Sequence, residues 1–205
     1  MVSSCSPKFV APLVQGSKVA QRSLSPRASL STVCFPDRAL LPSDSQHLWQ
    51  IERGITRTYT WDQEGAVTPL GIWGQGDIVG QSLANLTPYV IQGLGKVEAR
   101  RLPQNPWHNS DAILSHAQHL TTLLRIISIK RADQRLLSLL RWLAQRFGYV
   151  TPLGICTPLP MTHQELAETV NITRVTVTRL IGDLEQQGIL QWSRRRKFVL
   201  LDPNP

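Results

Sequence analysis

The chain has 205 residues, a net charge of +8 and a sequence pI near 10.0. That length allows one large domain or two small ones, and the positive charge favours a polyanionic partner, most simply nucleic acid. The three cysteines include no CxxC pair, which argues against zinc and iron–sulfur sites and favours a reducing compartment. No apolar run is long enough for a membrane helix, so we expect a cytoplasmic protein without membrane contact.

Residues 1–36 contain no acidic side chain and are rich in serine, with four prolines. A transit peptide can have this composition, but so can a basic tail that is disordered or adds edge strands, for example at Phe9-Val10. Residues 37–108 are different. Strand-like runs such as Ile55 to Trp61 and Ala66 to Trp73 alternate with glycine turns, which predicts an antiparallel barrel or a jelly roll.

From Asp111 the hydrophobic period becomes helical, and residues 109–131 are predicted to form one long helix. Apolar residues recur at heptad spacing along it, which favours pairing with a second copy of the helix. The alternative is a helix that packs only on its own barrel. The predicted pairing positions are Ile113, His116, Ala117, Leu120, Leu123, Leu124 and Ile127.

Residues 132–205 are predicted to form a third region. Its first helix, Ala132 to Phe147, is apolar on nearly two faces and should be a core element; a loop is expected from Thr151 to Pro160. Thr162 and Glu165 have capping-box spacing, Asn171 suits a tight turn, and Thr173 can cap the next helix. A two-stranded hairpin with a basic tip should follow.

The second of these short helices has two distinct faces. Its inward positions are apolar, whereas its outward positions are two cations and two small side chains, the layout of a helix-turn-helix that enters the DNA major groove. The inward residues are Val177, Leu180, Ile181 and Leu184, and the outward residues are Arg174, Val175, Thr178 and Arg179.

The run THQELAETVNITRVTVTRLIGDLEQQGIL, with the preceding RADQRLLSLLRWLAQRFG, resembles the Crp/Fnr family of bacterial transcription regulators. Within that family, TRVTVTRLIGDL is most similar to the cyanobacterial global nitrogen regulator. IERGITRTYTWDQEGAVTPLGIWGQGDIVGQ resembles the family's barrel. The resemblance implies an α+β fold: an N-terminal antiparallel jelly roll like cyclic-nucleotide-binding domains, a long dimerisation helix and a C-terminal winged helix-turn-helix.

The resemblance also implies roles for individual residues. It assigns base reading to Arg174, Val175 and Arg179, with Thr178 on the same face. Arginine suits guanine, whereas Val175, where several relatives carry Glu, can contact only a thymine methyl; the half-site should resemble the nitrogen regulator's GTA type. The expected phosphate contacts are Thr162, His163, Thr173, Thr176, Arg194, Arg195, Arg196 and Lys197.

The family's effector-binding residues are poorly matched. Gln81 stands where a glutamate would bind the ribose, and no arginine lies between Gly80 and Lys96, so we expect no cyclic nucleotide and no cofactor. The nitrogen regulator's 2-oxoglutarate-binding arginine and glutamate align with His116 and Thr121. Haem or metal binding by His108, His116 and His119 is also disfavoured. His116 and His119 are three apart on a predicted helix with no carboxylate nearby, which favours surface or interface packing.

The sequence therefore predicts a homodimeric transcription regulator that binds a palindromic operator on double-stranded DNA. One alternative is a regulator that senses 2-oxoglutarate or another small acid, with a cation-lined pocket beside His116. Another is a protein-interaction module that acts through a co-regulator. A barrel filled by Trp61 and Trp73 would indicate no small effector. An enzyme is not expected, because a metal site in a small barrel needs two or three histidines with a carboxylate, and the strand-like segment from Ala39 to Leu102 has only His47.

Overall fold

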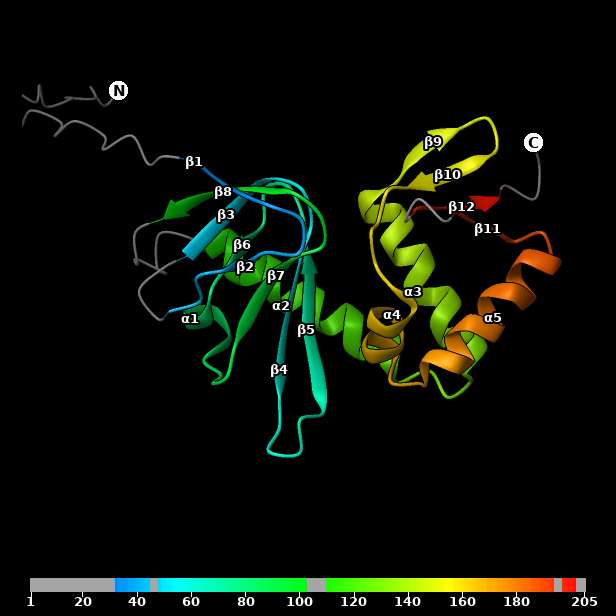
Figure 1. Cartoon of the computed structure of the whole chain (residues 1–205), viewed down its shortest axis with the longest axis horizontal. Coiled ribbons are helices and arrows are strands. Elements are labelled where there is room, and N and C mark those ends of the chain that lie inside the picture. Colours follow the sequence, from blue (N-terminus) through cyan, green and yellow to red (C-terminus); the bar gives the residue numbers. More distant parts are fainter. Residues whose placement is uncertain (1–31, 45–47, 103–109, 194–196, 202–205) are drawn as a thin grey trace, which may run out of the picture.

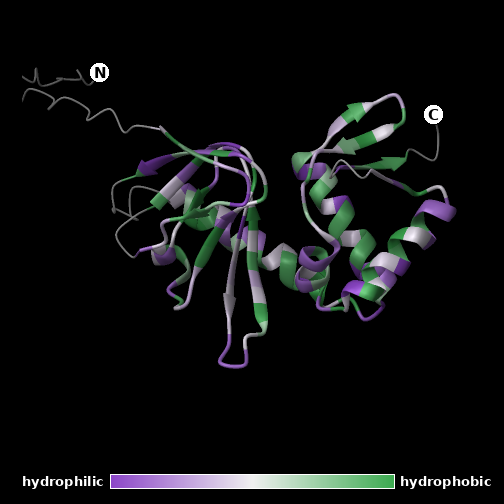
Figure 2. Ribbon diagram, viewed as in Figure 1, coloured by the Kyte–Doolittle hydropathy of each residue, from purple (hydrophilic) through white to green (hydrophobic). Residues whose placement is uncertain are grey.

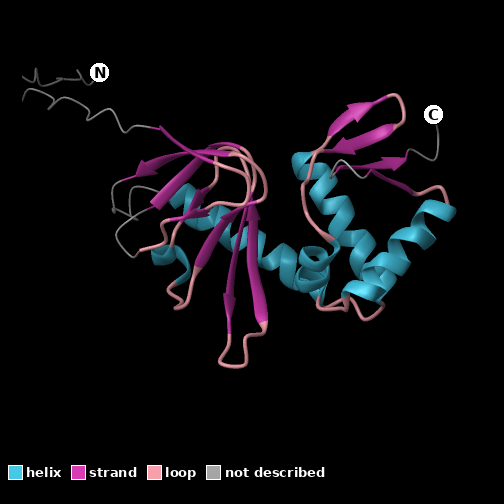
Figure 3. Ribbon diagram, in the orientation of Figure 1, coloured by secondary structure: helices cyan, strands magenta, loops and turns pink. Residues whose placement is uncertain are grey.

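A computed structural model of the chain describes residues 32–44, 48–102, 110–193 and 197–201. It has a β domain, a long helix α2 and a helical head that carries a small sheet (Figures 1 and 3). Three predictions, on Phe9-Val10, His47 and His108, lie outside the described residues. The β domain contains β1 (Thr32–Phe35), β2 (Leu40–Leu41), β3 (Leu48–Arg53), β4 (Thr56–Trp61), β5 (Val67–Trp73), β6 (Ile78–Val79), α1 (Gln81–Ala84), β7 (Val90–Gly93) and β8 (Val97–Leu102).

Two antiparallel sheets form the β domain, with strand orders β1-β8-β3-β6 and β2-β7-β4-β5. Both sheets contribute to one core, which includes Trp49 and Val97 from the first and Trp73 and Ile91 from the second. This two-sheet arrangement is a jelly roll, as the family resemblance predicted. β1 pairs with β8, so four residues of the predicted tail belong to the β domain.

The turn between β3 and β4 requires glycine. Gly54 has a φ of 89°, and a Cβ added there would lie 2.4 Å from the carbonyl oxygen of Lys96. Both the left-handed backbone and the close approach exclude a larger residue. This turn carries the chain from β3 in one sheet to β4 in the other, and Arg57 is the second residue of β4.

Helix α2 (Ser110–Ile127) lies along the β domain and leads to the head (Figure 1). The head contains α3 (Ala132–Phe147), α4 (His163–Val170), α5 (Arg174–Gln186) and a sheet of order β11-β12-β10-β9. The strands of that sheet are β9 (Tyr149–Thr151), β10 (Gly154–Thr157), β11 (Leu190–Ser193) and β12 (Lys197–Leu201). None of the helices in the described ranges could cross a membrane.

The loop predicted from Thr151 to Pro160 is wrong up to Thr157, and only residues 158–160 form a loop. β9 and β10 form a hairpin there, with Val150 opposite Ile155, and β10 also pairs with β12. Pro152 and Leu153 form its turn, and the Thr151 hydroxyl donates across it to the carbonyl of Gly154, the first residue of β10, at 2.7 Å. Pairing with the distant β12 stabilises the short strands, and local composition does not show such a contact.

One hydrophobic core runs from the jelly roll into the head. Ile72 and Leu94 from the β domain pack with Leu123 and Ile126 of α2, and these join the buried leucines of α3. As predicted, α3 is a core element, and the inward face of α5 is buried. Figure 2 shows hydrophobic and hydrophilic residues alternating along the helices of the head. The jelly roll and the head are therefore packed against each other through α2.

Candidate nucleic-acid interface

Helix α4 begins with the predicted capping box. The Thr162 hydroxyl accepts from the Glu165 backbone N–H at 3.2 Å, while the Glu165 carboxylate accepts from the Thr162 backbone N–H at 2.8 Å. The helix ends at Asn171, whose φ of 51° is left-handed. These local contacts fix where α4 begins and where the chain turns toward α5.

Helix α5 presents the four predicted base-reading side chains to solvent. Arg174, Val175, Thr178 and Arg179 are all exposed, and Val175 is 78% exposed. The Thr173 hydroxyl caps the helix by accepting from the Thr176 backbone N–H at 3.1 Å. Arg179 donates to Asp183 one turn further on at 3.2 Å, which orients its guanidinium along the helix. The outer face of α5 is therefore accessible for binding in a DNA major groove.

His163 of α4 contacts both the recognition helix α5 and the wing, which is the hairpin of β11 and β12. Its Nδ1 lies 2.9 Å from the Thr178 hydroxyl of α5, and its ring meets Trp192 of β11 edge-on, with centroids 5.3 Å apart. Burial and then Arg174 lower the pKa of His163 below its usual 6.5, so the ring is neutral at pH 7. The Thr178 hydroxyl donates to the Arg174 carbonyl at 3.0 Å, so Nδ1 of His163 is the donor to Thr178. A neutral ring then has no second N–H to donate to a phosphate.

The wing is held against the recognition helix. The Trp192 backbone N–H donates to Glu185 of α5 at 2.8 Å, and the Trp192 ring stacks on Phe198 of β12 at 5.6 Å. Lys197 is exposed at the start of β12. The predicted phosphate contacts of Arg194, Arg195 and Arg196 lie outside the described residues.

The predicted pairing surface of α2 requires a correction. His116 and Leu123 are buried within the protomer: His116 stacks on Trp73, and Leu123 belongs to the core shared with the head. Heptad spacing predicts an apolar stripe, but it does not tell which positions of the stripe pack on the protomer's own core. The remaining predicted positions, Ile113, Ala117, Leu120, Leu124 and Ile127, are exposed.

An aromatic stack lies at the contact between the jelly roll and α2. Trp73 is 1% exposed, its indole N–H donates to the Thr58 hydroxyl at 2.8 Å, and its ring lies 4.0 Å from that of His116. Nε2 of His116 donates to the Ile78 carbonyl at 2.6 Å. Trp61 is exposed at the end of β4, so of the two tryptophans that could have filled the barrel only Trp73 is buried. The described residues contain no group of three His, Cys, Asp or Glu that could hold a metal ion.

Comparisons with known proteins agree with this geometry. The model of the Crp-like helix-turn-helix domain matches residues 134–204. The regulatory protein CysR of Synechococcus elongatus is 36% identical over 165 residues, which cover 79% of this chain and 80% of that protein. The chain belongs to the Crp/Fnr family of transcription regulators.

Other Crp/Fnr proteins match different shares of the chain. The global nitrogen regulator of Synechococcus elongatus is 39% identical over 82 residues, or 39% of this chain and 37% of that protein. The structure of FixK2 from Bradyrhizobium japonicum covers 84% of this chain and 92% of its own with a TM-score of 0.68. At 18% identity, this likeness concerns the fold alone. The chain is thus a transcription regulator with a helix-turn-helix DNA-binding domain.

Sequence patterns missed the charged contacts between the jelly roll and the head. Arg38 and Arg57 of the β domain reach α4, and Arg146 of α3 pairs with Asp77 of the β domain. No local spacing indicates these pairs, because the partners are 69 to 127 residues apart. They bear on how the DNA-reading head is oriented.

Proposed function

We propose that the protein acts as a homodimer that binds a palindromic operator through α5 and the wing. The observation that carries this proposal is the division of α5 into two faces. Val177 and Leu180 anchor it in the core, while Arg174, Val175 and Arg179 are exposed. Arg179 would exchange its exposed contact with Asp183 for a base edge. Arginine forks suit guanine O6 and N7, and Val175 suits a thymine methyl.

The exposed apolar stripe on α2 supports the dimer. Leu124 is 62% exposed, and Ile113, Leu120 and Ile127 lie on the same face of the helix at similar exposure. Burying this stripe against a second copy would remove apolar surface from water. The resulting two-fold symmetry would present two recognition helices to half-sites about one helical turn apart.

We further propose that no cyclic nucleotide controls the protein. Trp73 and His116 stack where α2 closes the jelly roll. The Gln81 side chain donates to the Leu86 carbonyl at 3.1 Å and to the Thr87 hydroxyl at 2.9 Å, so it is engaged within its own loop. A cavity of about 440 Å³ beside the start of α2 is lined by Asp77 and Asp111, and none of its described lining residues is a cation that could hold a cyclic phosphate.

Selection of bound sequences from random double-stranded DNA tests the proposed function. The expected result is an inverted repeat whose half-sites contain guanine and a thymine at the position facing Val175. The selected DNA should be bound without any added nucleotide. Recovery of sequences without an inverted repeat, or binding that requires cyclic AMP, would contradict the proposal.

A further inference from the structure

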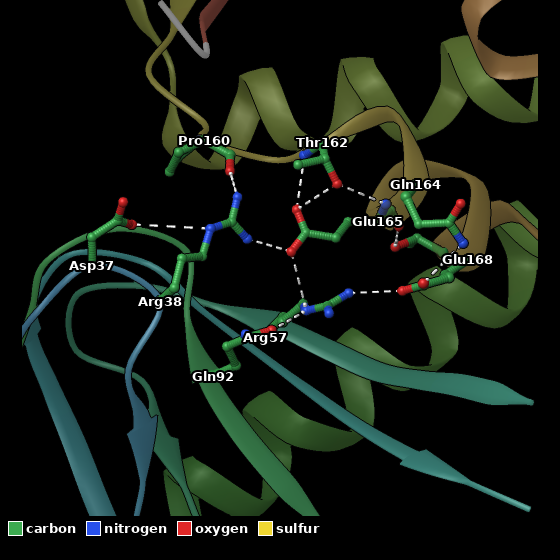
Figure 4. Close-up of polar contacts among 10 residues, drawn as sticks. Asp37, Arg38, Arg57, Gln92, Pro160, Thr162, Gln164, Glu165 and Glu168 are labelled. Atoms are coloured by element: carbon green, nitrogen blue, oxygen red, sulfur yellow. Dashed lines mark hydrogen bonds and ion pairs between the residues drawn. The ribbon is translucent and has the colours of Figure 1, made fainter. Parts of the chain in front are cut away.

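A polar joint connects the jelly roll to the first helix of the helix-turn-helix (Figure 4). Arg57 of β4 donates to Glu168 of α4 at 2.8 Å, and its Nε lies 3.5 Å from Oε1 of Glu165. Arg38, from the turn between β1 and β2, donates to the same Glu165 oxygen and to the Pro160 carbonyl at 2.6 Å. Two cations of one domain thus hold two carboxylates of the other.

Glu165 is the central residue of this joint. One carboxylate oxygen completes the capping box of α4, while the other accepts from Arg38 and faces Arg57. The Glu165 side chain is only 7% exposed. A carboxylate buried to this degree depends on its cationic partners, because their removal leaves an uncompensated charge. The capped end of α4 is therefore fastened to the jelly roll.

The jelly roll holds both arginines in place for this contact. Arg57 Nε donates to Gln92 of β7 at 2.9 Å, and its guanidinium lies 4.6 Å from the centre of the Tyr59 ring. Arg38 has a φ of 64°, in the left-handed region that disfavours a large side chain. Its two side-chain contacts with the head compensate for that backbone conformation.

The joint does not cover the DNA-reading surface. Arg174, Val175 and Arg179 of α5 are exposed while Arg38 and Arg57 are engaged with α4. Because α4 packs against α5, a contact that fixes α4 on the jelly roll also fixes the direction of α5. The joint therefore orients the head and leaves it free to bind.

We propose that Arg38 and Arg57 are positioning residues for operator binding. They fix each head relative to α2. The distance between the two α5 helices of a dimer is therefore set before the protein binds DNA. This inference rests on the proposed dimeric function. Ordering the heads in advance lowers the entropy cost of engaging both half-sites together. Binding to random DNA, which depends on phosphate contacts and not on register, gains little from it.

The test uses the full chain with Arg57→Gln and Arg38→Gly, and with Arg53→Gln as the matched control. Glycine suits the φ at position 38, and Arg53 is a 79% exposed arginine at the end of β3 that does not reach the head. Affinities are measured for the selected operator and for random DNA at several salt concentrations. Each joint variant should lose about tenfold in operator affinity, with unchanged random binding and salt slope. Arg53→Gln should match the wild type.

A charge exchange separates positioning from general damage. Arg57→Glu should weaken operator binding, and adding Glu168→Arg should restore part of it, because an opposite-charge pair forms again at the same place. Equal losses on operator and random DNA with a shallower salt slope would show that the arginines contact DNA directly, and would overturn the inference. So would unchanged or tighter operator binding in both joint variants. A wild-type protein with no sequence preference would instead refute the proposed function itself.

Discussion

Val175 is the residue whose chemistry most narrows the operator. Its isopropyl group is 78% exposed on the outer face of α5 and can make only apolar contact with a base. Val175→Glu supplies a carboxylate that accepts from cytosine N4. We expect the preferred base at one position in each half-site to change from thymine to cytosine, with about 1–3 kcal/mol of discrimination.

Competition binding between operators that differ at this single position measures the change. Val150→Glu is the matched control, since Val150 is 85% exposed on β9 and the substitution adds the same charge. The control should leave the base preference as it is. If Val175→Glu weakens binding to all operators alike, Val175 does not face a base.

His116 and His119 make stability depend on pH. Burial is the main cause that lowers both pKa values below 6.5, with Arg146 adding to the effect at His119. The unfolded chain therefore binds protons that the folded chain excludes. The free energy of unfolding should be highest above pH 6.5 and should fall as the pH decreases through 6.5 toward the lowered values.

Urea unfolding at pH 7.5, 6.5 and 5.5 tests this expectation. The double variant His116→Gln/His119→Gln should be less stable at pH 7.5, because it loses the stack on Trp73. Its stability should nevertheless vary less between pH 7.5 and 5.5 than that of the wild type. An undiminished pH dependence in the double variant would place the responsible groups elsewhere.

At the scale of elements, α2 offers a sharp test of pairing. Leu124 lies on the exposed apolar stripe, whereas Gln118 is exposed on a different side of the same helix. Leu124→Glu would bury two carboxylates against each other in a dimer, so the protein should become monomeric and lose operator affinity. Gln118→Glu should remain dimeric in sedimentation measurements. Dimers of unchanged stability in both variants would exclude α2 as the interface.

Elements with local causes were predictable from the sequence. The capping box of α4, the left-handed Asn171 and the cap of α5 each depend on residues within a few positions of one another. The hairpin β9–β10 was missed because its stability comes from pairing with β12, more than 40 residues away. Heptad spacing likewise marked α2 as apolar but could not assign His116 and Leu123 to the protomer's own core.

In the molecule as a whole, the jelly roll and α2 support the head. Trp73 and His116 stack between them, and Arg57 projects from the jelly roll to α4. The shared core and the polar joint give the DNA-reading helix a fixed orientation. The proposal that no cyclic nucleotide controls the protein agrees with heads that are already held in one orientation by these contacts.

In the proposed dimer, two linked heads bind an inverted repeat in a fixed register. Inserting five base pairs between the half-sites of the selected operator rotates one half-site by about half a helical turn. Inserting ten returns both half-sites to the same face of the DNA. Titration of the three DNAs with the full chain should show tight binding of one dimer to the original operator. The five-base-pair insertion should reduce affinity to the level of a single half-site. Equal affinity for the original operator and the five-base-pair insertion would contradict the account.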